Sequence, residues 1–317
     1  MLKFALLGKC GYSVKFSPLI PNYLAVATSE YFGLAGSGTL IVLRLNFEDS
    51  AELIQTRIWK DGLYDVVWPL FNPNCIITGS GDGVLQLWDL KYEKVPLKVY
   101  SGHYGEISSI SCSKIDHQFI SSSWDSNIKL WDLNEKQAVS NFREPFGVVH
   151  NTSFSKHKEC LFSSVSESGN LRIWDTTIPH SIICCKAHDT QILSCDWSPF
   201  NEFLIATSGS DGLIRGWDIR NCVQPQFQIK DSGCPVKRIQ FSPYHFDILA
   251  TVGYDFKTKI WDICNVHKPL NISVNHSDFV YGLDWNYHKP GQLADCSWDK
   301  MVSIFTQNSL ENLKHKM

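Results

Sequence analysis

Short runs in which apolar and polar residues alternate recur along the chain at a nearly constant interval. Such alternation predicts half-buried β-strands. A run of this kind leads into each of five Trp-Asp pairs: Trp88-Asp89, Trp131-Asp132, Trp174-Asp175, Trp217-Asp218 and Trp261-Asp262. The pairs are 43 or 44 residues apart, so each strand belongs to a repeating unit.

The same period extends beyond the pairs in both directions. It reaches apolar runs at residues 40–43 and 302–305, which lack the Trp-Asp pair. Aromatic residues close an earlier strand in six units, and Cys112 stands at that place in the remaining one. These aromatic residues are Phe16, Trp68, Phe154, Trp197, Phe241 and Trp285. Seven units of four strands each therefore fit the chain.

These repeats resemble the WD-repeat family, in which units of about 40 to 45 residues each form one four-stranded blade of a propeller. The resemblance covers nearly the whole chain and implies an all-β fold, a seven-bladed WD-repeat β-propeller. A closed ring must join its first and last blades without an exposed strand edge. Residues 2–7 precede the first unit as residues 53–58 precede the second. We therefore expect this N-terminal strand to complete the seventh blade and close the ring.

Composition supports one well-packed domain. Of 317 residues, 44% are hydrophobic and 19% are charged, which suits a buried core and not a disordered chain. Repetition is continuous from Gly11 to Phe305. We expect a single propeller over residues 1–307, followed by a short C-terminal tail over residues 308–317.

Charge and hydropathy exclude several classes of partner. The net charge is −3 and no block of Lys or Arg occurs, which argues against nucleic acid as a ligand. No apolar run approaches the roughly 20 residues of a membrane span, and residues 4–7 are too few for a signal peptide. We expect a protein with no membrane span that is not secreted.

The cysteines predict neither a disulfide framework nor a metal site. The chain contains 11, an odd number, and no Cys-x-x-Cys pair. Cys184 and Cys185 are adjacent, so their side chains would point to opposite faces of a strand. Buried, reduced thiols explain this usage best, and we expect no metal and no cofactor.

Three histidines occupy the same place in their units, four residues before an apolar strand residue: His103, His188 and His276. Repetition argues against a catalytic role, although Ser, His and Asp together resemble a hydrolase triad. In the WD-repeat family such a His bonds a Ser or Thr and an Asp, which reach the Trp. The resemblance implies two structural tetrads: His103, Ser122, Asp125 and Trp131, and His188, Thr207, Asp211 and Trp217. No catalytic residue is expected.

The loops expected at the same end of the units as these histidines contain aromatic and acidic residues. Most units also carry an Asp in the turn before the strand that ends in the Trp-Asp pair. The residue before this Asp is usually small, but in three units it is Trp124, Tyr254 or Trp298. Large aromatic residues at loop tips favour a binding surface. Residues of the neighbouring loops and strand starts join this candidate peptide-binding set: Asp61, Tyr64, Asp65, Glu106, Gln191, Asp278 and Phe279. Such a rim suits an amphipathic helix with one cationic side; ordinary solvated loop acids are the alternative.

Several stretches are more specific than generic WD repeats. They are Gly11-Tyr12-Ser13-Val14-Lys15-Phe16-Ser17-Pro18, Leu24-Ala25-Val26-Ala27-Thr28, Asp61-Gly62-Leu63-Tyr64-Asp65-Val66, Ile192-Leu193-Ser194-Cys195-Asp196-Trp197, Arg215-Gly216-Trp217-Asp218-Ile219-Arg220 and Ala294-Asp295-Cys296-Ser297-Trp298-Asp299. They are similar to the family of peroxisomal receptors for the N-terminal, type 2 targeting signal.

This resemblance implies a non-enzymatic receptor that binds a short N-terminal helix on cargo proteins. The helix has Arg or Lys and Leu early and His or Gln and Leu later. A co-receptor peroxin then accompanies the complex to docking proteins at the peroxisomal membrane, so the receptor shuttles between cytoplasm and peroxisome. We expect Asp61 and Glu106 to meet the basic residue of the signal. Its apolar side would contact Trp124, Tyr254, Phe279 and Trp298.

Two other functions remain open. The Trp217-Asp218-Ile219-Arg220 stretch fits the W-D-x-R pattern, which resembles substrate receptors of cullin-based ubiquitin ligases. There the Arg would contact an adaptor from the opposite face, whereas here Arg220 can equally occupy a solvated turn. A generic WD-repeat scaffold that accepts several unrelated partners is the third interpretation.

Overall fold

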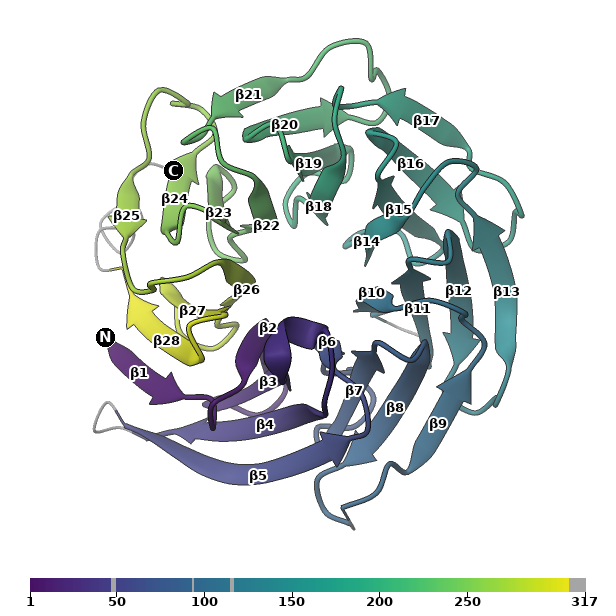
Figure 1. Ribbon diagram of the computed structural model, residues 1–317. Coiled ribbons are helices and arrows are strands. Elements are labelled where there is room, and N and C mark those ends of the chain that lie inside the picture. Colours follow the sequence, from purple (N-terminus) through teal and green to yellow (C-terminus); the bar gives the residue numbers. More distant parts are fainter. Residues whose placement is uncertain (47–49, 93, 115–116, 308–317) are drawn as a thin grey trace.

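Seven four-stranded antiparallel sheets are arranged around a central channel in the computed structural model of this protein (Figure 1). The structure describes residues 1–46, 50–92, 94–114 and 117–307. The expected all-β, seven-bladed propeller is confirmed. The tail predicted over residues 308–317 lies outside the described residues.

The first four blades follow one another along the chain, and in each the first strand lies beside the channel. Blade 1 contains β2 (Cys10–Phe16), β3 (Tyr23–Ser29), β4 (Gly38–Leu45) and β5 (Ala51–Trp59). Blade 2 contains β6 (Leu63–Val67), β7 (Cys75–Ser80), β8 (Val84–Asp89) and β9 (Lys98–Ser101). Blade 3 contains β10 (Ile107–Cys112), β11 (Gln118–Ser123), β12 (Asn127–Asp132) and β13 (Ala138–Arg143). Blade 4 contains β14 (Val149–Phe154), β15 (Leu161–Ser166), β16 (Asn170–Asp175) and β17 (Ile183–Lys186).

The last three blades continue the same order, except that the seventh takes its outer strand from the start of the chain. Blade 5 contains β18 (Ile192–Trp197), β19 (Leu204–Gly209), β20 (Leu213–Asp218) and β21 (Phe227–Lys230). Blade 6 contains β22 (Val236–Phe241), β23 (Ile248–Gly253), β24 (Thr258–Asp262) and β25 (Asn271–Ser273). Blade 7 contains β26 (Val280–Trp285), β27 (Gln292–Ser297), β28 (Met301–Thr306) and β1 (Leu2–Ala5).

The N-terminal strand closes the ring as expected. β1 pairs antiparallel with β28, from Leu2 opposite Ile304 to Ala5 opposite Met301. Leu6 continues this contact, because its backbone N–H donates to the carbonyl of Lys300 at 2.8 Å and its side chain is fully buried. The outer edge of β28 is therefore paired, and blade 7 presents only the short strand β1 as its outer edge.

The Trp-Asp pairs have a local structural role in every blade that contains one. Each Trp indole N–H donates to the hydroxyl of a Ser or Thr ten residues earlier, on the neighbouring strand, at 2.8 to 3.0 Å. Each Asp carboxylate accepts the backbone N–H two residues later, at 2.7 to 2.9 Å. This Asx turn ends the third strand and reverses the chain toward the fourth.

Hydrophobic cores lie between the blades, one at each of the seven junctions of the described chain. The core between blades 2 and 3, for example, brings Leu85 and Tyr100 against Ile107 and Trp131. The core between blades 7 and 1 combines Ala294 and Val302 with residues of β2 to β4. Because successive side chains of a strand point to opposite faces, each blade buries one face against each neighbour.

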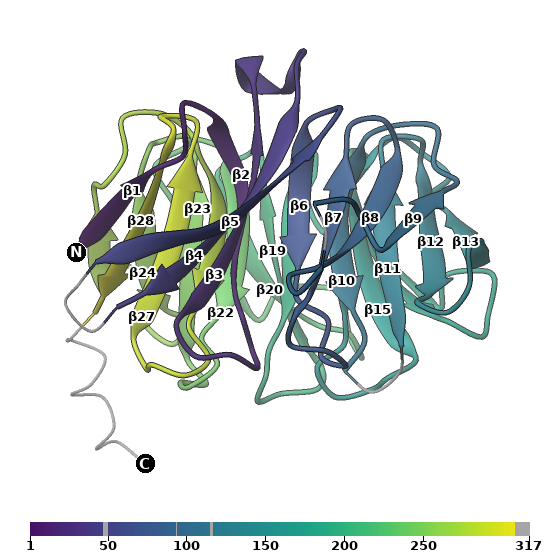
Figure 2. The ribbon, with the colours of Figure 1, turned by 90° about the horizontal axis from the view of Figure 1, so that it is seen from below.

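The two ends of the propeller differ in the loops that they carry. One end, called here the histidine end, holds the loops before the inner strands and the turns between second and third strands. It includes His103, His188 and His276. The short helix η1 (Tyr31–Gly33), in the insertion between β3 and β4, projects from this end (Figure 2). No helix in the described part of the chain is long and apolar enough to span a membrane.

Candidate functional site

The histidines at this end belong to hydrogen-bonded groups that fasten the loop before an inner strand to the blade of that strand. In blade 5, His188 lies 2.9 Å from Asp211 and 2.9 Å from Thr207, whose hydroxyl also accepts the Trp217 indole N–H. These are the four residues that the sequence places in one tetrad. Burial lowers the pKa of His188 despite the opposing effect of Asp211, so the imidazole is neutral at physiological pH.

The tetrad of blade 3 contains Ser121, and the prediction of Ser122 is wrong. His103 Nε2 lies 2.8 Å from Ser121 Oγ, which also accepts the Trp131 indole N–H at 2.8 Å. The other imidazole nitrogen of His103 lies 3.0 Å from Asp125. Ser122 points to the opposite face of β11, where its hydroxyl lies 2.8 Å from Ser108. Alternation along the strand separates the two serines.

Blade 7 contains a charged version of the same group. His276 lies between two carboxylates, at 2.9 Å from Asp295 and 2.9 Å from Asp299. Asp295 takes the place of the usual Ser or Thr and also accepts the Thr258 hydroxyl from blade 6. Burial alone would lower the pKa of His276, but the two carboxylates outweigh it and raise the pKa to about 9. The imidazolium is thus a buried structural cation.

Each inner strand contains a β-bulge at the same position, near its start. The bulge leaves one residue of the inner strand without a cross-strand partner and re-aims its side chain. The seven residues, called here the bulge ring, are Tyr12, Tyr64, Ser108, His150, Leu193, Lys237 and Tyr281. Each lies near the start of an inner strand, so the seven positions ring the channel at the histidine end, which is called here the channel mouth.

Three neighbouring members of the bulge ring are tyrosines in contact. The ring centroid of Tyr12 lies 4.9 Å from that of Tyr64 and 5.3 Å from that of Tyr281. Tyr281 also stacks on Trp298 at 4.7 Å, and its hydroxyl lies 3.0 Å from that of Tyr254. Together with Phe279, which contacts Tyr254 and Trp298, these residues form a continuous aromatic sector over blades 6, 7, 1 and 2.

The structure brings together four of the aromatic residues that the sequence assigned to peptide binding: Tyr64, Tyr254, Phe279 and Trp298. It places the fifth, Trp124, apart in blade 3, where 53% of its surface is exposed and no described aromatic ring contacts it. Sequence reasoning missed two members of the sector, Tyr12 and Tyr281. Aligning the units on the first apolar residue of each inner strand would have found them, because both occupy the bulge position.

Two carboxylates border the aromatic sector on the side of blades 2 and 3. Burial, and then the charge of Asp61, raises the pKa of Glu106. A Cβ at Gly81 would lie 3.1 Å from Asp61 and 3.2 Å from Tyr64, so Asp61 is beside the sector. Burial, and then the charges of Glu106 and Asp61, raise the pKa of Tyr64. Neither acid forms an ion pair within the described residues, and the adjacent Lys60 pairs with Asp82 at 3.1 Å instead.

Asp278 and Gln191, the other polar residues in the predicted set, make local contacts at the same end. Asp278 accepts the backbone N–H of Phe279 at 2.7 Å, which shapes the loop before β26. Gln191 Oε1 lies 3.0 Å from Nε2 of His150, a member of the bulge ring. Gln191 thus borders the mouth in blade 5, away from the aromatic sector.

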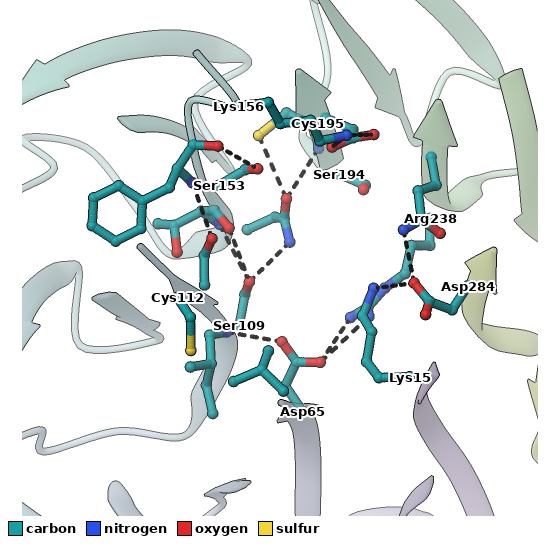
Figure 3. Close-up of a pocket in the computed structure, with 18 of the residues that line it drawn as sticks. Lys15, Asp65, Ser109, Cys112, Ser153, Lys156, Ser194, Cys195, Arg238 and Asp284 are labelled. Atoms are coloured by element: carbon teal, nitrogen blue, oxygen red, sulfur yellow. Dashed lines mark hydrogen bonds and ion pairs between the residues drawn. The ribbon is translucent and has the colours of Figure 1, made fainter. Parts of the chain in front are cut away.

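Asp65 does not belong to the rim, contrary to its place in the predicted set. It is 2% exposed and lies inside the channel, where Arg238 reaches it across the ring at 3.3 Å (Figure 3). Its second oxygen accepts the backbone N–H of Ile110 at 2.8 Å. The bulge at Tyr64 is the physical reason, because it turns Asp65 inward and Tyr64 toward the mouth.

A cavity of about 440 Å³ occupies the channel toward the opposite end (Figure 3). Its carboxylates are already paired: Lys15 with Asp284 and Lys156 with Asp196, both at 2.9 Å. Asp196 and Asp284 also accept a backbone N–H from a neighbouring blade at 2.8 Å. These groups therefore fasten inner strands to one another.

The described residues contain no cluster of three or more His, Cys, Asp or Glu side chains that could hold a metal ion. All 11 cysteines are free thiols.

Arg220, the basis of the ubiquitin-ligase alternative, is engaged within its own blade. Its guanidinium pairs with Asp218 at 2.6 Å and lies 4.1 Å above the ring of Phe203. These contacts are those of an arginine in the turn that follows a strand.

Comparisons of the sequence with known proteins agree with the propeller fold. The family of the WD domain, G-beta repeat, matches residues 94–132 and 180–218. The peroxisomal targeting signal 2 receptor of Mus musculus is 39% identical over 94% of each chain. The chain belongs to the peroxisomal targeting signal 2 receptor family. The receptor of Saccharomyces cerevisiae is 27% identical, covering 98% of this chain and all of the yeast protein. That of Schizosaccharomyces pombe is 29% identical over 96% of this chain.

Membership confirms the family resemblance that the sequence carried. The type 2 receptor family consists of WD-repeat propellers that act as receptors and not as enzymes. The tetrads of this member are accordingly structural, and the aromatic sector with the neighbouring acids is the candidate binding surface.

Proposed function

We propose that this type 2 receptor binds the N-terminal peroxisomal targeting helix of cargo proteins across the channel mouth at the histidine end. The observation that carries the proposal is the pair of unpaired acids, Asp61 and Glu106, directly beside the aromatic sector. A half-buried carboxylate whose pKa is raised gains free energy when a cation approaches it. A basic residue of the helix supplies the cation, and its apolar face covers the aromatic rings.

Delivery to the organelle completes the proposed role. The receptor carries bound cargo from the cytoplasm, together with a co-receptor peroxin, to docking proteins of the peroxisomal membrane. The exposed apolar side chains of the insertion support a partner that covers the histidine end. Tyr31 and Leu34 of that insertion are 73% and 88% exposed, and exposed apolar groups in one place favour a protein contact.

The Glu106→Gln variant tests the site. Losing one partner of a desolvated interfacial ion pair costs about 2–5 kcal/mol, so we expect the Kd for the helix to rise about tenfold or more. The assay is fluorescence anisotropy with a labelled R-L-x5-H-L helix, with and without cytosolic extract as a source of co-receptor.

Glu159→Gln is the matched control. Glu159 is an exposed carboxylate in the loop between β14 and β15, at the opposite end of the propeller. This variant should bind as the unmodified protein does, and a scrambled helix should bind neither. Unchanged affinity of Glu106→Gln would remove Glu106 from the site, and absence of binding to the unmodified protein under both conditions would reject the proposed function.

A further inference from the structure

Lys237 is the one member of the bulge ring with a cationic side chain at neutral pH. It is the bulged residue of β22 in blade 6. In a ring of seven blades, the position opposite blade 6 falls between blades 2 and 3, which carry Asp61 and Glu106 (Figure 1). The two acids and Lys237 therefore belong to opposite sides of the ring at the histidine end.

The Lys237 ammonium has no carboxylate partner among the described residues. Its Nζ lies 4.9 Å from the ring centroid of Tyr281, a cation–π contact. By contrast, Lys259 of the same blade pairs with both Asp231 and Asp255. Burial, and then the charge of Arg238, lowers the pKa of Lys237 to about 8. Lys237 is half-buried, so its ammonium is partly desolvated, and its three N–H donors are accessible to a ligand.

Two acids, Asp278 and Glu167, lie near the side chains that surround Lys237, since their charges act on Tyr281 and His150, but neither forms an ion pair with Lys237 among the described residues. Burial and the charge of Lys237 lower the pKa of His150 to about 4, so His150 is neutral at pH 7. Arg238 is directed into the channel, where it bonds Asp65 and Ser13. At the histidine end, blades 2 and 3 thus carry the acids Asp61 and Glu106, blades 7 and 1 carry aromatic rings with Asp278 beside them, and blade 6 carries the cation Lys237.

An α-helix has a matching polarity along its axis. Its N-terminal end carries partial positive charge, and its last four carbonyl groups lack intrahelical partners and carry partial negative charge. Resting on the proposed function, we infer that Lys237 donates hydrogen bonds to carbonyl oxygens at the C-terminal end of the bound targeting helix. The helix then lies across the mouth in one direction only, with its N-terminal basic residue over Asp61 and Glu106.

Substitution of Lys237 tests this inference. Lys237→Met keeps the length of the side chain and removes the charge. A hydrogen bond to a charged group contributes enough that we expect about a tenfold rise in Kd for the helix. Lys237→Arg retains the charge and should restore most of the affinity. Lys230→Met, on the exposed face of outer strand β21, is the matched control and should bind normally.

Direction is tested by pairing receptor and peptide changes. One peptide carries an added Glu at its C-terminal end and the other an added Glu at its N-terminal end. The C-terminal Glu should strengthen binding to the unmodified receptor, and Lys237→Met should abolish this gain. The N-terminal Glu should weaken binding equally in both proteins. A pure folding defect would not produce coupling to one end of the peptide alone.

The outcomes separate this inference from the proposed function. If the helix binds the unmodified receptor and Glu106→Gln weakens it, but Lys237→Met has no effect, Lys237 plays no part and the inference is wrong. Coupling of Lys237 to the N-terminal Glu instead would reverse the direction and equally overturn it. Failure of the unmodified receptor to bind any helix would overturn both proposals. Thermal unfolding of Lys237→Met should be unchanged or raised, because the variant buries no unpaired ammonium.

Discussion

The single residues of this propeller divide into those that fasten strands within a blade and those whose side chains remain free at the channel mouth. The Trp indoles and their hydroxyl acceptors belong to the first group and follow a strict ten-residue spacing. Applied to Trp131, this spacing selects Ser121. The prediction of Ser122 failed because three consecutive serines end β11, and composition alone cannot tell which of them faces the Trp. Strand parity, counted from the Trp, decides it.

The sequence predicts which residue types occur in the loops of the histidine end better than it predicts the direction of each side chain. Acidic and aromatic residues near Glu106 and Tyr254 were recognisable from the loops. The inward turn of Asp65 was not, because it depends on a bulge that only the register with β7 defines. A bulge shifts which side chains face the mouth without altering the apolar pattern of the strand.

The charged group of blade 7 makes stability depend on pH in a defined window. The pKa of His276 is about 9 in the folded state and 6.5 in its unperturbed state. The protonated imidazole therefore stabilises the fold fully below pH 6.5, and this contribution disappears as pH rises through 9. The loss amounts to about 3 kcal/mol. Denaturant unfolding followed by Trp fluorescence should show it between pH 6.5 and 9.

Asp295→Ser isolates the contribution of His276. The substitution supplies the hydroxyl type found in blades 3 and 5 and removes one of the two carboxylates that raise the pKa. Its unfolding free energy should vary much less over the same pH window. His188 provides an internal contrast, because its lowered pKa changes stability only as pH falls below about 6.5. An unaltered slope in Asp295→Ser would assign the pH dependence to another group.

Among the structural elements, strands were predictable and their irregularities were not. The alternating runs identified the third strand in every unit, and aromatic closures identified the inner strand in six of the seven, because these strands are buried against both neighbouring blades. In the sequence, the insertion between β3 and β4 is visible only as a longer spacing of 52 residues between Phe16 and Trp68. Its position against the mouth depends on tertiary contacts, in which Tyr64 donates its hydroxyl to the carbonyl of Gly33 at 2.8 Å.

Gly33 allows the insertion to approach the aromatic sector. Its φ is +76°, and a Cβ at this residue would lie 2.8 Å from the hydroxyl oxygens of both Tyr12 and Tyr64. Gly33→Ala should therefore displace the insertion from the mouth. If the insertion borders the bound helix, the Kd should rise about fivefold, equivalent to roughly 1 kcal/mol. The same anisotropy titration measures it.

Gly8→Ala serves as the control for backbone strain. Gly8 has a φ of +80°, and no atom lies within 4 Å of the position of its Cβ. Both variants should lose similar stability from the unfavourable φ, roughly 1 kcal/mol, but only Gly33→Ala should weaken helix binding. Equal affinity in the two variants would place the insertion outside the binding surface.

At the scale of the whole molecule, the ring depends on a short segment from the far end of the chain. The seven-fold repeat and the need for a paired edge were sufficient to assign residues 2–7 to blade 7, since an unpaired edge of β28 would attract other strands. Repeat architecture is predictable at this scale because each blade buries its faces only against its neighbours. The mouth is not, because it combines one residue from each of seven units that lie far apart in sequence.

Removal of residues 1–7 should open the ring. The deletion exposes the edge of β28 and removes fully buried Leu6 from the core between blades 7 and 1. Because loss of one large core side chain costs about 2–5 kcal/mol, we expect the midpoint of thermal unfolding to fall by about 5 °C or more. Size-exclusion chromatography should also show self-association through the open edge.

The decisive comparison is a rearranged chain in which residues 1–7 follow Gln307 through a short linker. There the strand reaches β28 by a local hairpin, as the outer strands of blades 1 to 6 reach their neighbours. Recovery of the midpoint in this chain would show that pairing with β28, and not the N-terminal position of the segment, closes the ring; a deletion that unfolds at the original midpoint would show that β1 is dispensable for closure.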